Sequence, residues 1–224
     1  MNFRRKAKLK GRGIAKSLLG LSKRERLIIS VIALSIGLFT IEHFLGISGI
    51  FFILSLAIMT NVLLFFSLYN DLQENFSWQI FILPFFFSLA FGLFFFLVPV
   101  RYLTRIFTTS LYGIGLYSLF LSQNIFTVSS IRTIALLSSA RTVSFIMTLI
   151  TYFFLSNVLF SLHLNYFFYL GLLVFYTIPL VTHSIWSHTF EKKLSANIQW
   201  AFILSLILIE IGSFLWFWPS TPTV

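Results

Sequence analysis

The sequence predicts an all-α fold, a polytopic transmembrane helical bundle of about seven spans. Hydrophobic residues make up 58% of the 224 residues and charged residues only 10%. Soluble domains typically contain about 45–50% apolar residues and about 25% charged residues. A chain this apolar has too few polar residues to cover a surface in water, so its exterior must face lipid. The apolar residues also gather into seven runs of about 20 residues, the length that a helix needs to cross about 30 Å of hydrocarbon.

The predicted spans share an almost complete lack of charge, since none contains Lys or Arg and only two contain an acid, Glu42 and Glu210. They run near 27–45, 50–69, 79–98, 106–126, 142–162, 166–186 and 198–218. The first follows a long basic segment and shows no small-residue cleavage site, so it is interpreted as a signal anchor. The chain therefore divides into a basic tail (1–26), a transmembrane domain (27–218) and a short C-terminal tail (219–224).

The connections differ in how clearly they are defined. The sequence Gly46-Ile47-Ser48-Gly49 predicts a tight turn between the first two spans, and His163-Leu164-Asn165 predicts another between the fifth and sixth. Residues 70–78 are predicted to form a loop. The segment 127–141 is too polar to span and too apolar for a free loop, which favours a short helix in the membrane interface. Pro179 lies inside the sixth span and is expected to kink it unless neighbours compensate.

Positive charge predicts the orientation. Ten of the sixteen Lys and Arg residues fall within the first 26 positions. If the N-terminus is cytoplasmic, the inner side holds fourteen Lys and Arg and the outer side only Arg101 and Arg105. Cytoplasmic loops carry such an excess of basic residues. We therefore expect a multi-pass protein of the plasma (inner) membrane, with a cytoplasmic N-terminus and an outer C-terminal tail.

Six residues are candidates for an intramembrane or interfacial polar site near the outer side, because charge in a bilayer is costly and often functional. They are Glu42, His43, Arg101, Arg105, His163 and Glu210. Glu210 lies roughly 12 Å from the outer end of its span. We expect it to contact an arginine, preferably Arg101. Such pairs either hold the bundle together or form an outward-facing polar site or proton relay.

Four residues are candidates at the cytoplasmic face, namely Arg132, Arg141, His183 and His188, which would bind phosphate if the protein acts on a lipid-linked substrate. His183 and His188 lie five residues apart, about 140° around a helix, so they do not form the i, i+4 pair of a helical zinc site. We expect no metal site.

Several chemistries are excluded by what the sequence lacks. There is no Cys and only one Asp, Asp71, which excludes thiolate chemistry, paired-aspartate proteases and Asp-rich metal-dependent phosphotransferases. No H-E-x-x-H, G-x-S-x-G or Walker motif is present. We therefore assign no catalytic residue and expect no cofactor.

The basic tail predicts a lipid partner. Ile14, Leu18 and Leu21 recur at helical spacing among basic residues, a pattern typical of an amphipathic helix on anionic lipid headgroups. The expected partners are thus the lipid bilayer, its anionic headgroups at the tail, and possible membrane protein partners. No nucleic acid is expected, because no aromatic residues are interleaved with the charges.

Three functional classes follow. The favoured class is a non-enzymatic membrane component, because no catalytic set is present. The second is a small transporter or channel that uses Glu210, Glu42, Arg101 and Arg105. The third is an enzyme acting on a lipid-linked substrate at one face.

Overall fold

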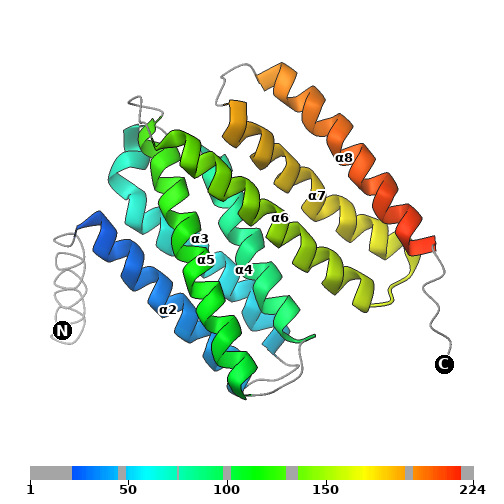
Figure 1. Ribbon diagram of the computed structural model, residues 1–224, viewed down its shortest axis with the longest axis horizontal. Coiled ribbons are helices and arrows are strands. Elements are labelled where there is room, and N and C mark those ends of the chain that lie inside the picture. Colours follow the sequence, from blue (N-terminus) through cyan, green and yellow to red (C-terminus); the bar gives the residue numbers. More distant parts are fainter. Residues whose placement is uncertain are drawn as a thin grey trace, which may run out of the picture.

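The computed structural model describes residues 22–44, 49–74, 76–97, 102–129, 136–189 and 194–217. Within these ranges the chain forms helices and no strand, which confirms the all-α fold. The helices are α2 (Lys23–Phe44), α3 (Ile50–Glu74), η2 (Trp78–Phe81), α4 (Ile82–Phe95), α5 (Tyr102–Ser129), α6 (Leu137–Ser161), α7 (Tyr166–Thr189) and α8 (Leu194–Phe217). They lie side by side in one bundle, alternating in direction along the chain (Figure 1).

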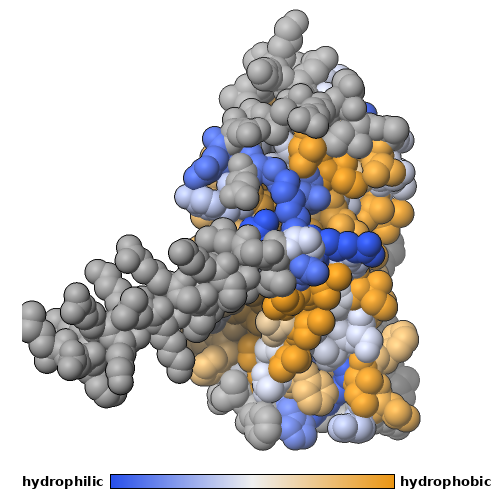
Figure 2. All heavy atoms as spheres, turned by 90° about the vertical axis from the view of Figure 1, so that its left-hand side faces the viewer, coloured by the Kyte–Doolittle hydropathy of each residue, from blue (hydrophilic) through white to orange (hydrophobic). Residues whose placement is uncertain are grey.

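Six helical segments of the described chain are long and apolar enough to cross a membrane. They lie in α2, α3, η2 with α4, α6, α7 and α8. Large apolar side chains also stay exposed on the outside of the bundle, for example Ile32, Phe66 and Phe153. Figure 2 shows hydrophobic side chains over much of one face, beside a cluster of hydrophilic ones. This exterior suits lipid better than water.

Helix α5, which contains the predicted span 106–126, differs from this pattern and is not among the six apolar segments. Its apolar sequence is interrupted by polar side chains, of which Ser122, Gln123 and Thr127 are buried inside the bundle. Buried polar residues of this kind lower the hydropathy of α5 while they face other helices. Its 28 residues would extend about 42 Å, and it runs alongside α2 and α6 (Figure 1).

Two predictions about connections are wrong. Residues 70–74 of the predicted 70–78 loop belong to α3, where Asp71 accepts from Lys23 Nζ at 2.6 and 2.7 Å. The predicted interface helix at 127–141 is wrong at both of its ends, since α5 continues to Ser129 and α6 begins at Leu137, and residues 130–135 lie outside the described ranges. Transmembrane helices can project beyond the hydrocarbon, and apolar runs alone therefore underestimate their length. Helix α7 continues through Pro179, and residues 45–48 lie outside the described ranges.

Helix α4 forms the centre of the bundle. It packs against α3, α5, α6 and α7, and 61% of the span formed with η2 is buried. Its sequence is apolar on all sides, as expected for a helix surrounded by other helices. The ring of Tyr112 on α5 stacks on Phe87 of α4 and contacts Phe91 in a tilted arrangement. A Cβ placed on Gly92 would lie 2.6 Å from Ile53 Cγ2, so this glycine permits close approach of α3.

Candidate functional site

Charged residues of α2 and α5 meet at one end of the bundle. Glu42 is 5% exposed, and neither carboxylate oxygen has a hydrogen-bond partner among the described residues. Arg105 is near enough to interact electrostatically with this carboxyl group, although the two form no ion pair within 4.0 Å. Arg105 Nη1 is 3.2 Å from His43 Nδ1. Because guanidinium only donates, Nδ1 accepts, and His43 carries its proton on Nε2. We call Glu42, His43 and Arg105 the charged cluster.

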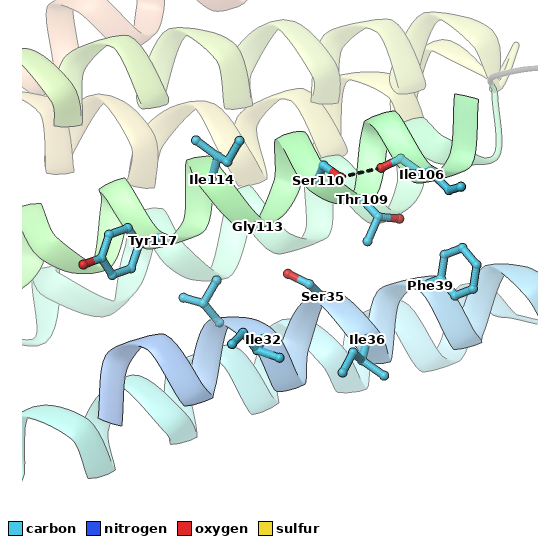
Figure 3. Close-up of a pocket in the computed structure, with 11 residues that line it drawn as sticks. Ile32, Ser35, Ile36, Phe39, Ile106, Thr109, Ser110, Gly113, Ile114 and Tyr117 are labelled. Atoms are coloured by element: carbon cyan, nitrogen blue, oxygen red, sulfur yellow. Dashed lines mark hydrogen bonds between the residues drawn. The ribbon is translucent and has the colours of Figure 1, made fainter. Parts of the chain in front are cut away.

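A groove lies between α2 and α5 (Figure 3). Its volume is about 490 Å³, and its lining is largely apolar. Figure 3 shows Phe39 and Ile106 at one end of this groove and Tyr117 toward the other. Phe39 stacks on His43 with ring centroids 6.0 Å apart, and Ile106 directly follows Arg105. The charged cluster does not line the groove but lies next to this end of it.

The interior also contains a chain of hydroxyl groups across three helices. Thr60 of α3, Ser88 of α4 and Tyr112 of α5 are all fully buried. Thr60 Oγ1 donates to the Leu56 carbonyl at 2.9 Å and lies 2.9 Å from Ser88 Oγ, which lies 3.0 Å from the Tyr112 hydroxyl. Each hydroxyl has one proton, so Ser88 donates to Thr60 and Tyr112 donates to Ser88. The chain connects the central helices.

We expect Ser88→Ala to destabilise the protein more than Tyr112→Phe does. Ser88→Ala leaves the buried Tyr112 hydroxyl without its acceptor, which costs about 1–2 kcal/mol. Tyr112→Phe removes only the terminal donor and should cost about 0.5–1 kcal/mol. Unfolding of both variants in mixed micelles by denaturing detergent measures the difference. A larger cost for Tyr112→Phe would contradict the assigned direction.

The predicted cytoplasmic-face residues do not share one site. His183 is fully buried between helices, with its Nε2 3.5 Å from the Gln123 amide nitrogen, so it does not reach the surface. His188 is exposed, and its ring meets Phe145 at 5.7 Å. Arg141 is half-buried near the start of α6. Arg132 lies outside the described residues.

Gln123 was not among the residues selected from the sequence. An amide inside an apolar span needs a hydrogen-bond partner as a histidine does, and this reasoning would have selected Gln123 with His183. Gln123 is fully buried, and its amide oxygen has no partner among the described residues.

The remaining outer-side candidates are dispersed. Glu210 is exposed on α8, and among the described residues the one ion pair is Lys23–Asp71. The side chain of Arg105 is directed at His43 rather than Glu210. Arg101 lies outside the described ranges, so its contact with Glu210 stays a prediction. His163 occupies the turn between α6 and α7 with φ of 45°, and its Nδ1 lies 2.9 Å from the Ser161 carbonyl.

Within the described part of the chain, no three residues of the His, Cys, Asp and Glu types come together as metal ligands. The helical bundle and its six apolar helices define the class: a multi-pass integral membrane protein. No protein-family model, curated protein or solved structure matches this chain.

Proposed function

We propose that the chain is a non-enzymatic membrane component that binds a phospholipid in the groove between α2 and α5. The observation that carries this proposal is the position of the apolar groove next to the charged cluster, because Phe39 at its end stacks on His43, which accepts from Arg105. An acyl chain matches the apolar lining, and a phosphate matches the guanidinium of Arg105.

The length of the groove fits one leaflet. Its lining on α5 extends from Ile106 to Tyr117, eleven residues along the helix, which corresponds to roughly 16 Å. Half of a hydrocarbon core is about 15 Å thick. A lipid of the outer leaflet would therefore lie with its chain along α2 and α5 and its phosphate at the charged cluster.

Glu42 has a supporting role in this arrangement. Its carboxyl group is buried and near enough to Arg105 to interact electrostatically, which would favour a guanidinium position near the groove. Arg105 Nη1 already donates to His43, and a guanidinium carries further N–H donors of the kind that a phosphate accepts from. Glu42 would then position Arg105 rather than contact the lipid.

The topology belongs to the same proposal. The protein resides in the plasma membrane with its N-terminus in the cytoplasm, and α5 crosses with the six apolar helices to give seven crossings. The fourteen-to-two distribution of basic residues supports this orientation. The basic tail, including Ile14, Leu18 and Leu21, binds anionic headgroups of the inner leaflet.

The test is photo-crosslinking in vesicles that contain a phosphatidylglycerol with a photoreactive group in its acyl chain. We expect label on peptides covering 28–44 and 102–117. Ile36→Trp, which fills the groove from an exposed position, and Arg105→Gln should each reduce this labelling several-fold. A diacylglycerol probe with the same chains but no phosphate should label these peptides weakly.

Arg141→Gln serves as the matched control, because Arg141 lies at the start of α6 and does not line the groove. It should leave labelling of α2 and α5 unchanged. Equal labelling of all lipid-facing helices, unaffected by Ile36→Trp and Arg105→Gln, would show ordinary boundary lipid and overturn the proposal.

A further inference from the structure

Helix α8 carries an acidic side chain on its exposed surface. Only 17% of its apolar span is buried, the lowest share among the six apolar helices, and of the described helices α7 is the one that packs extensively against it. Figure 1 shows α8 at the edge of the bundle beside α7. Glu210 lies twelve residues after Ile198 and seven before Phe217, the ends of that span. Its position is therefore nearer the middle of the span than either end.

Glu210 points away from α7. The residues of α8 that are buried against the bundle include Ala201, Ser205 and Gly212. At 100° per residue, all three lie about 140–180° around the helix from Glu210. The Tyr169 hydroxyl of α7 donates to the Gly212 carbonyl at 2.8 Å, which fixes this face of α8 against α7. The opposite face presents Glu210 within apolar side chains such as Ile203, Leu206 and Ile207.

Lipid acyl chains cannot provide the hydrogen-bond partner that the Glu210 carboxyl group needs. A carboxyl group in hydrocarbon needs a hydrogen-bonding or charged partner, and acyl chains provide neither. No ion pair or hydrogen bond joins Glu210 to another described side chain. An apolar face alone would be covered by lipid, but the carboxyl group requires a polar group at the same depth.

We propose that a second copy of this chain supplies that group, through a parallel α8–α8 contact in which the two Glu210 side chains meet. The strong bias of basic residues gives all copies one orientation, so every copy carries Glu210 at the same depth. A two-fold axis along the membrane normal then brings identical surfaces together. A carboxylic acid both donates and accepts, so two such groups that share at least one proton are complementary. The contact is independent of the groove between α2 and α5.

Disulfide crosslinking of single-cysteine variants tests this contact, because the native chain contains no cysteine. Ile203 and Leu204 are adjacent and similarly exposed, at 46% and 43%. They lie about 20° and about 120° around the helix from Glu210. In vesicles of phosphatidylglycerol and phosphatidylethanolamine, oxidation should give a covalent dimer of the full chain for Ile203→Cys and little for Leu204→Cys.

The Glu210 variants test the polar contact itself. In the Ile203→Cys background, Glu210→Leu should weaken dimerisation about tenfold, as expected for a lost interhelical hydrogen bond. Glu210→Gln should retain it, because an amide also donates and accepts. Fluorescence transfer between labelled copies at a series of lipid-to-protein ratios measures the change. Equal crosslinking at positions 203 and 204, unchanged dimerisation of Glu210→Leu, or a monomer at every ratio would each overturn the proposal.

Discussion

Gly92→Leu is expected to destabilise the bundle by about 3 kcal/mol, because it overpacks the most buried helix. A Cβ on Gly92 would lie 2.6 Å from Ile53 Cγ2 and 3.1 Å from Ile53 Cγ1. Ile53 is fully buried and branched at Cβ, so its side chain has few rotamers with which to move aside. Helices α3 and α4 must then separate. Detergent unfolding followed by tryptophan fluorescence measures the loss.

Gly171→Leu is the matched control. Gly171 is exposed on α7, and nothing lies within 4 Å of a Cβ placed there. This variant should keep or slightly increase stability, since Leu favours helix more than Gly by about 0.5–1 kcal/mol. In a Gly92→Ala background, Ile53→Ala should recover part of the loss through a favourable coupling energy. Similar destabilisation by both glycine variants would show that close packing at Gly92 is not the cause.

Arg105→Gln is expected to destabilise the protein by about 2 kcal/mol, because it removes the opposite charge beside a buried carboxyl group. Glu42 is 5% exposed, and its oxygens accept no hydrogen bond from described residues. Arg105 is half-buried, so the converse change, Glu42→Gln, leaves an arginine that can extend toward water. Glu42→Gln should therefore cost less than Arg105→Gln.

The double variant distinguishes a charge effect from lost packing. When Glu42→Gln is added to Arg105→Gln, no charge is left buried, and stability should rise above that of Arg105→Gln alone. Thermal unfolding in the same detergent for the two single variants and the double variant gives the coupling energy. Additive losses would contradict an electrostatic interaction between Glu42 and Arg105.

The helices were predictable because a bilayer requires long apolar segments. The orientations of polar side chains and the ends of the helices were harder to predict. The segment 127–141 looked like a separate interface helix, since hydropathy does not reveal where a helix such as α5 or α6 ends outside hydrocarbon. Composition also could not distinguish a polar residue facing another helix, such as Gln123, from one facing the exterior, such as Glu210. These orientations depend on which helices pack together.

The candidate site was partly accessible to the same reasoning. Glu42, His43 and Arg105 could be assigned to one end of the bundle from their positions at span ends, because consecutive helices alternate in direction. That α2 packs against α5, and that a groove joins them, depends on the order of helices around α4. His183 was placed at a surface, but its helix turns it into the interior. The position of a residue in its span predicts its depth in the membrane, whereas helix packing decides whether its side chain faces the interior or the exterior of the bundle.

The location of the C-terminus tests the central claim most directly, because it depends on whether α5 crosses the membrane. The six apolar helices alone would return the C-terminus to the side of the N-terminus, whereas seven crossings place the two ends on opposite sides. Paired reporters, one active only in the cytoplasm and one only outside it, are fused after Val224 and at the N-terminus of the full chain. We predict a cytoplasmic N-terminus and an external C-terminus. Two cytoplasmic termini would contradict a membrane-spanning α5.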